Sequence, residues 1–280
     1  MFGKLMKHEW RATAPTQGLL ALASLGMGIL AGIILRLIFT FSDKIPEILA
    51  ATMGASIGFM FLAIMICDVA MSILLMVRFY KHKFTDEGYL TFTLPVSSHQ
   101  VFLSAALNNL IWVIISILAI ALSFLASFLI GTAGVPEMQE IQEILDTFGF
   151  TIETILPADL KNCLFIYILQ GIVALPYSVV IVMTCLTVGA TIAKKHKILA
   201  AIGFYYALSW LSGIFNGIVS VVLSLNNADL LDSFNQEAYL QYMQNTVITT
   251  GIISLVWQLA LILGGYLLST RLMSRKLNLP

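Results

Sequence analysis

The chain has 280 residues, of which 59% are hydrophobic and only 11% are charged. Soluble domains average about 45–50% apolar and about 25% charged residues, so this composition excludes a water-soluble fold. Fifteen Lys and Arg residues balance fifteen Asp and Glu residues, which leaves no basic excess for binding nucleic acid. Cys67, Cys163 and Cys185 lie in or beside apolar runs without a close partner. This spacing argues against a disulfide framework or a metal site.

Six apolar runs are long enough to cross a membrane as helices, since about 17–25 residues span a hydrocarbon core of about 30 Å. The run nearest the N-terminus is too long for a signal peptide and lacks a prompt cleavage site, so we expect it to be retained. We predict an all-α integral membrane protein in which residues 1–280 form one transmembrane domain. The predicted spanning helices cover residues 17–41, 49–77, 101–130, 163–192, 198–223 and 246–269.

Basic residues decide the expected orientation, because cytoplasmic loops retain Lys and Arg. With six spans, only Lys44 and Lys161 fall between the spans on the other side, which also collects most carboxylates. Both termini are therefore expected in the cytoplasm. The basic residues on the cytoplasmic side are Lys4, Lys7, Arg11, Arg78, Lys81, Lys83, Lys194, Lys195, Lys197, Arg271, Arg275 and Lys276.

The first residues combine apolar and basic positions at helical spacing. Phe2, Leu5, Met6 and Trp10 share one face, while the basic residues lie on others. This pattern predicts a helix in the membrane interface over residues 1–14, with Trp10 and Arg11 as interfacial anchors. The alternative is a basic flank that only enforces orientation.

The loop between the second and third predicted spans covers residues 78–98 and carries the most distinctive sequence. It contains Asp86-Glu87-Gly88-Tyr89-Leu90-Thr91-Phe92-Thr93-Leu94-Pro95, followed by serines at the entry to the third span. This run resembles the short loop found in many Firmicutes permeases of ABC-2 type transporters. The six-span plan and the basic N-terminal segment extend the resemblance over the whole chain.

The resemblance implies a fold, a mechanism and partners. In that family the N-terminal segment is an elbow helix, and the loop after the second span forms a cytoplasmic coupling helix that docks on an ATPase subunit. It implies an exporter subunit in a bacterial plasma membrane, paired with a second identical or different permease subunit. No GxxxxGK[ST] phosphate loop occurs in the chain, so ATP and Mg are expected on a separate ABC ATPase rather than on this chain. In the coupling helix, Arg78, Lys81 and Lys83 are expected to face the inner surface. The alternative for residues 78–98 is a solvated loop that only orients the protein.

Asp68 is the only carboxylate deep within a predicted span. A charge at that depth needs a partner, a proton or water, which makes Asp68 the intramembrane site candidate. A structural ion pair or hydrogen bond and a role in a transport pathway both remain open. In the second case Asp68 would suit a transporter driven by an ion gradient, the main alternative to an ATP-driven exporter.

Two glycine motifs require interpretation. Gly54-Ala-Ser-Ile-Gly58 matches the GxSxG nucleophile pattern, but that chemistry needs a strand-turn-helix elbow and a nearby histidine base. Its place within a predicted membrane helix argues against a hydrolase, and we expect no catalytic residue. The same glycines, like Gly28/Gly32 and Gly213/Gly217, have the GxxxG spacing that lets helices pack closely, within one subunit or between two.

Residues 132–161 form the longest polar segment, on the predicted outer side. Pro136 can start a helix with one apolar and one acidic face. Such a helix can cap the outer end of a pathway or simply rest on the membrane.

The exported substrate is not indicated by the sequence: no residue distinguishes among peptide, drug, lipid and glycan cargo.

Overall fold

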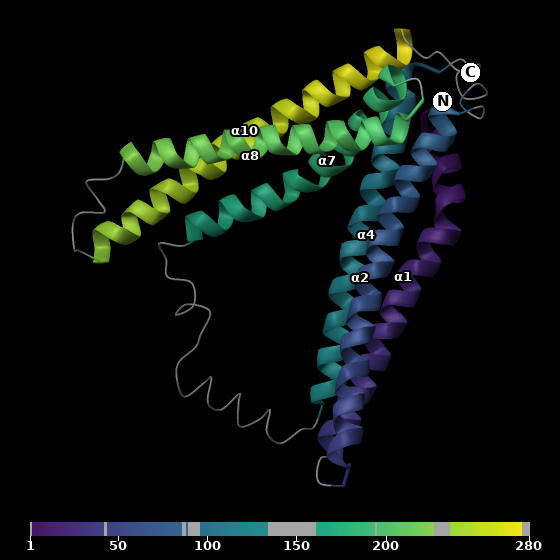
Figure 1. The fold of residues 1–280 in the computed structure, drawn as a ribbon, viewed down its shortest axis with the longest axis vertical. Coiled ribbons are helices and arrows are strands. Elements are labelled where there is room, and N and C mark those ends of the chain that lie inside the picture. Colours follow the sequence, from purple (N-terminus) through teal and green to yellow (C-terminus); the bar gives the residue numbers. More distant parts are fainter. Residues whose placement is uncertain are drawn as a thin grey trace. The chain divides into compact units, whose positions relative to one another are not determined.

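The computed structural model describes residues 2–41, 44–85, 88, 96–133, 161–193, 195–226 and 236–275. This part of the chain folds into six long helices and contains no strand (Figure 1). The helices are α1 (Phe2–Thr40), α2 (Glu47–Phe84), α4 (Ser98–Thr132), α7 (Lys161–Ile192), α8 (Lys197–Asn226) and α10 (Gln236–Arg275).

All six helices are long and apolar enough to cross a membrane. About 20 residues are enough to do so, whereas these helices have between 30 and 40 residues. In the described residues, the predicted all-α architecture with six helices able to cross a membrane is therefore confirmed. The extra turns lengthen the predicted segments, most of all at the starts of α1 and α10.

Hydrogen bonds and charges explain where α2 begins and ends and where α4 begins. The backbone N–H groups of Leu49 and Ala50 donate to the carbonyl of Pro46, as expected where a proline precedes the first helical turn. Glu47 then lies in the first turn of α2, and the last turn contains three basic residues. These charges oppose the partial charges of the helix ends and stabilise them. Ser97 precedes α4, and its Oγ accepts a hydrogen bond from the N–H of Gln100.

The chain divides into two compact units, and both α2 and α4 contribute residues to each. Unit 1 comprises residues 1–78 and 107–151, and unit 2 comprises residues 79–106 and 152–280. In their described parts, unit 1 holds α1 with most of α2 and α4, while unit 2 holds α7, α8 and α10 with the end of α2 and the start of α4.

In unit 1, α1 packs through a stripe of small and polar residues. A Cβ added at Gly28 would lie 2.5 Å from the carbonyl oxygen of Ser123, and one at Gly32 would lie 3.0 Å from Cα of Ser127. The predicted GxxxG contact at these two glycines is thus confirmed as packing between α1 and α4 within the chain. The buried residues of α1 are Glu9, Thr13, Gln17, Ala21, Ser24, Gly28, Ala31 and Gly32.

The other two GxxxG pairs behave differently. A Cβ at Gly54 or Gly58, on α2, would meet nothing within 4 Å, and the same holds for Gly213 and Gly217 on α8. Within the described residues, these pairs make no close helix contact. Ser56 lies inside α2, where its hydroxyl donates to the carbonyl of Met53 at 2.6 Å. It is therefore not on the strand-turn-helix elbow that a GxSxG nucleophile requires.

Unit 2 uses close glycine contacts to join its helices. A Cβ at Gly189 on α7 would lie 2.6 Å from the backbone nitrogen of Ala201 on α8. On α10, a Cβ at Gly265 would lie 2.8 Å from Oγ1 of Thr184 on α7, and one at Gly251 would lie even closer to the side chain of Ile166. Backbone approach of this kind is the usual means of packing helices in lipid.

Residues 2–14 are part of the same continuous helix as the first span. The described structure therefore shows no separate elbow helix. Pro15 lies inside this helix, where it removes a backbone donor and weakens the ladder at that point. The predicted coupling helix is likewise not shown, and the acidic stretch of the 132–161 segment lies outside the described residues.

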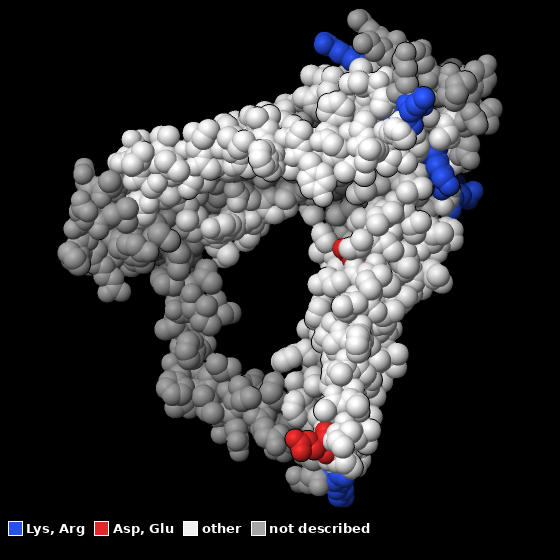
Figure 2. All heavy atoms as spheres, in the orientation of Figure 1, with Lys and Arg blue, Asp and Glu red and all other residues white. Residues whose placement is uncertain are grey.

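Figure 2 shows long stretches of uncharged surface on the helices. Within unit 1, Lys4, Lys7 and Arg11 lie in the first turns of α1. Arg78, near the end of α2, lies at the same end of the unit, because it contacts Glu9 of α1. Lys44 lies in the turn beyond the opposite end of α1. The described cations of unit 1 thus gather mainly at one end of its helices.

Candidate functional site

The predicted coupling segment, Asp86 to Pro95, lies outside the described residues except for Gly88. Gly88 is buried, and its N–H donates to the carbonyl of Thr85 at 2.7 Å. The structure does describe both ends of this loop: the last turns of α2 and the first turns of α4.

Aromatic side chains pack together where these two helix ends meet in unit 2. Phe79 lies edge-on to Phe84, with ring centroids 5.7 Å apart, and edge-on to Phe102 at 6.4 Å. Phe102 in turn contacts Tyr266 of α10 at 5.8 Å. The rings of Phe79, Phe84 and Phe102 are each less than 5% exposed. We call Phe79, Phe84, Phe102 and Tyr266 the loop-end cluster.

His99 connects the loop-end cluster to α10 by a polar contact. Its Nδ1 lies 2.9 Å from Oη of Tyr266, which is a hydrogen bond whose donor depends on the histidine tautomer. The two rings also lie against each other, with centroids 5.6 Å apart. The start of α4 is thus held to α10 by both apolar and polar contacts.

The three basic residues expected at the inner surface differ in their surroundings. Lys81 is exposed, but Lys83 is only 2% exposed and Arg78 is half-buried. Arg78 Nε lies 3.7 Å from Oε2 of Glu9, and its Nη1 donates to the carbonyl of Ala12 at 3.2 Å. Arg78 therefore binds α1 instead of facing the inner surface freely.

Thr13 is the centre of a buried polar group in unit 1. Its Oγ1 accepts a hydrogen bond from Nε1 of Trp112 at 2.8 Å. The Thr13 hydroxyl lies 3.0 Å from the carbonyl of Glu9 and 3.4 Å from Oδ1 of Asn108, and it can donate to one acceptor at a time. One turn further along, Gln17 Nε2 donates to the carbonyl of Met71 on α2 at 3.0 Å. These contacts join α1 to both neighbouring helices.

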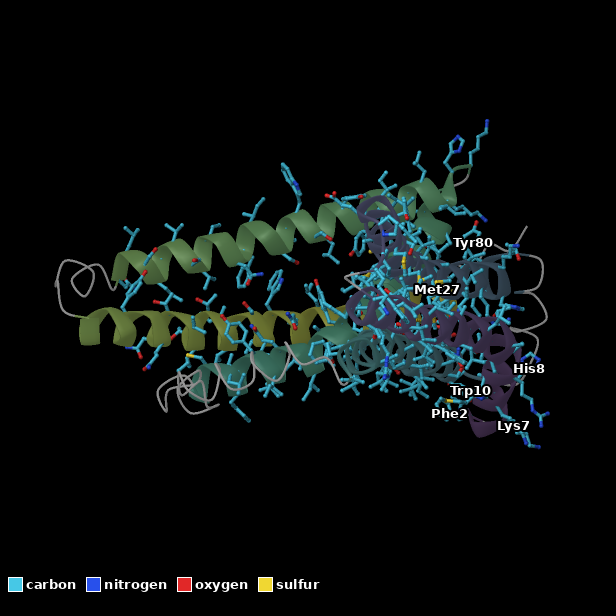
Figure 3. All side chains as sticks on the ribbon, turned by 90° about the horizontal axis from the view of Figure 1, so that it is seen from below. Phe2, Lys7, His8, Trp10, Met27 and Tyr80 are labelled. Atoms are coloured by element: carbon cyan, nitrogen blue, oxygen red, sulfur yellow. The ribbon has the colours of Figure 1, made fainter. Side chains whose placement is uncertain are left out.

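Trp10 packs against this polar group, whereas Arg11 does not. The Trp10 ring stacks on Trp112, with centroids 4.7 Å apart and planes 15° from parallel. Arg11 is exposed, as are Lys7 and His8, whose side chains project from the first turns of α1 (Figure 3). Trp10 thus has a packing role between helices, and its predicted anchoring role in the membrane interface stays a prediction.

Asp68 lies half-buried on α2, one turn from the buried residues Ile64 and Met71. Among the described residues, no side chain forms a hydrogen bond or ion pair with it. The ion-pair interpretation of Asp68 therefore finds no partner in the described part of the chain.

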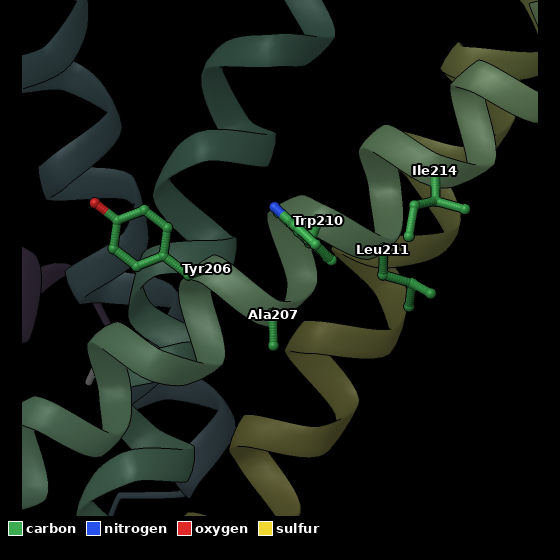
Figure 4. Close-up of a pocket in the computed structure, with 5 residues that line it drawn as sticks. All are labelled: Tyr206, Ala207, Trp210, Leu211 and Ile214. Carbon is green, nitrogen blue, oxygen red and sulfur yellow. The ribbon is translucent and has the colours of Figure 1, made fainter.

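A shallow apolar pocket of about 440 Å³ lies on α8. One face of the helix lines it, with Tyr206, Ala207, Trp210, Leu211 and Ile214 (Figure 4). Trp210 is 76% exposed, and an apolar helix face of this kind is what lipid normally covers. The pocket has too few polar groups to orient a small ligand.

No group of three or more His, Cys, Asp or Glu side chains in the described residues is arranged to hold a metal ion. Cys67, Cys163 and Cys185 are free thiols.

Sequence reasoning missed the pairing of Glu9 with Arg78 and that of Thr13 with Trp112. A signal for them existed, because Glu9, Thr13 and Gln17 recur every fourth residue on one face of a helix. Polar residues at this spacing on a membrane helix indicate hydrogen bonds to neighbouring helices.

No family model, curated protein or solved structure matches the chain.

Proposed function

We propose that this chain is the membrane-spanning permease subunit of an ATP-driven ABC exporter. The observation that carries the proposal is the resemblance of Asp86 to Pro95, placed between the second and third spanning helices, to the coupling loop of ABC-2 type permeases. The proposal includes an elbow role for residues 1–14 and a coupling role for residues 78–98. It also places the protein in a bacterial plasma membrane with both termini in the cytoplasm.

The surroundings of the loop support this proposal. A loop that transmits movement from a partner protein to the membrane helices needs ends that are packed rigidly against those helices. Both ends of this loop are packed: Phe84 is 3% exposed and Phe102 is fully buried. A loop that only orients a protein by its charge needs no such packing.

The partners follow from the same proposal. ATP and Mg would be bound by a separate ABC ATPase, and a second permease subunit, identical or different, would complete the membrane unit. The lipid bilayer covers the apolar helix faces. The exported cargo would be a peptide, a drug or a lipid-like molecule.

The experiment replaces residues 86–95 by a Gly/Ser linker of equal length and equal charge. The basic residues before the loop are kept, so membrane insertion and topology should be preserved. We expect the variant to reach the membrane but to lose co-purification with the partner ABC ATPase that the unaltered protein retains. Reversal of charge at Lys195, which follows α7, and at Lys197, the first residue of α8, serves as the control and should retain most of the ATPase. Normal ATPase binding and normal ATP hydrolysis by the linker variant would overturn the proposal.

The second candidate is a transporter driven by an ion gradient, and Asp68 is the observation that favours it. A half-buried carboxylate without a partner in the described residues is suited to bind and release a proton. In vesicles without nucleotide, substrate movement that follows a proton gradient and disappears in Asp68→Asn would support this candidate over the first.

A further inference from the structure

We propose that the loop-end cluster, together with His99, transmits movement of the loop between α2 and α4 to α10. This inference rests on the proposed function, since it concerns how force from an ATPase would enter the membrane helices. Tyr266 is assigned as the positioning residue on α10, and Phe102 as its counterpart on α4.

The two ends of the loop are packed together by side chains of the loop-end cluster. Phe79 contacts both Phe84, at the end of α2, and Phe102, near the start of α4. All three rings are buried, and close-packed interiors transmit displacement because they compress little. Displacement of either end of the loop therefore displaces the other.

These packed loop ends contact α10 through Tyr266. Tyr266 meets Phe102 through its ring and His99 through its hydroxyl group. The contact is directional, because the hydrogen bond fixes the Tyr266 hydroxyl against α4. Among the described aromatic contacts, these two are the only ones that join α4 to α10.

Close to Tyr266, α10 is packed against α7. Gly265 lies so close to Thr184 that an added Cβ would be 2.8 Å from its hydroxyl. Ser269, fully buried, donates to the Thr184 hydroxyl at 3.1 Å. Displacement at Tyr266 is therefore not absorbed locally and moves α10 together with α7.

The test uses Phe102→Leu, which keeps an apolar side chain but removes the ring, and Tyr266→Phe, which keeps the ring but removes the hydroxyl group. Tyr205→Phe on α8 is the control, because Tyr205 is 42% exposed and lies outside the loop-end cluster. A spin label at Leu267, which is 49% exposed on α10, reports movement. Each variant is prepared as the full complex with the ABC ATPase, and spectra are recorded with and without MgATP. Thermal unfolding shows that each variant is folded.

We expect MgATP to change the spectrum of the label in the wild type and in Tyr205→Phe. In Phe102→Leu and Tyr266→Phe, ATPase co-purification should stay normal while the spectral response to MgATP is reduced. The factor by which MgATP shifts the conformational equilibrium of α10 should fall about tenfold, as expected for the loss of one coupling contact. Should Phe102→Leu fail to fold, Tyr266→Phe carries the test alone.

A full MgATP response in Tyr266→Phe and in folded Phe102→Leu, with the ATPase bound, would overturn the inference and leave the proposed function standing. Absence of ATPase binding by the wild type would instead refute the proposed function, and the inference with it. Loss of ATPase binding in Tyr266→Phe alone would also overturn the inference, because the residue would then shape the docking surface and not transmit movement.

Discussion

Glu9 and Arg78 form an ion pair at the ends of α1 and α2, and each is mostly shielded from solvent. Their side chains are 11% and 22% exposed, respectively. A charge in such a position depends on its surroundings, because removal of one member takes away an opposite charge where little water can replace it. The pair fixes α1 to α2 at Arg78, which directly precedes Phe79 of the loop-end cluster in the sequence.

Arg78→Gln should therefore lower the free energy of unfolding by about 1–3 kcal/mol, since the Glu9 carboxylate loses its cation. Glu9→Gln should cost a similar amount. The double variant should lose less than the sum of the single losses, because each single change removes the same Glu9–Arg78 interaction and the double variant loses it only once. Thermal unfolding of the four proteins in detergent measures this difference, and strictly additive losses would show that the two residues do not interact.

Asp68→Asn should leave the unfolding free energy within about 1 kcal/mol of the wild type, because a neutral amide removes the cost of a charge in the membrane without breaking an ion pair. Expression level and thermal unfolding test this expectation, and transport is measured separately. A loss of several kcal/mol would instead reveal a cation bound to Asp68, supplied by another part of the chain or by a second subunit.

At the scale of the helices, three glycine pairs with the same spacing have different surroundings. Gly28 and Gly32 lie against the backbone of α4, whereas the pairs on α2 and α8 face open space. The spacing alone is the same in all three. The difference arises from which helix face the neighbouring helix covers.

Gly28→Ala should consequently lower the unfolding free energy by about 1–3 kcal/mol, because a methyl group there forces α1 and α4 apart. Gly58→Ala is the matched control, since its methyl group meets no atom within 4 Å. It should leave the stability of the subunit unchanged. Equal destabilisation by both changes in thermal unfolding would contradict the observed packing of α1 on α4.

At the scale of the whole molecule, the helix count and the basic residues together predict a topology. Single cysteines in place of Thr151 and Asn227, in a chain without its three native cysteines, should react with an impermeant thiol reagent from outside the cell. A cysteine in place of Lys195 should react only after permeabilisation. The physical reason is the retention of Lys and Arg on the cytoplasmic side. Labelling of position 195 in intact cells would reverse the orientation.

The amino-acid sequence by itself determined the six spanning helices, because the thickness of the hydrocarbon core sets a length of apolar chain that each span must reach. It also indicated the site of the loop between α2 and α4, through its resemblance to permease loops. Apart from the polar face that Glu9, Thr13 and Gln17 mark on the first helix, it did not indicate which faces of the helices pack together. Lipid and protein interiors are about equally apolar, so hydrophobicity does not distinguish a lipid-facing side from a packed side.

Only the tertiary structure decided which residues meet. His99 and Tyr266 are 167 positions apart in the sequence, and Glu9 and Arg78 come from different helices. Polar and small residues make these contacts specific, because hydrogen bonds and close backbone approach depend on geometry that no local pattern encodes. The same reason explains why Gly28 packs against α4 while Gly58 contacts no other described helix, although each lies in a GxxxG sequence.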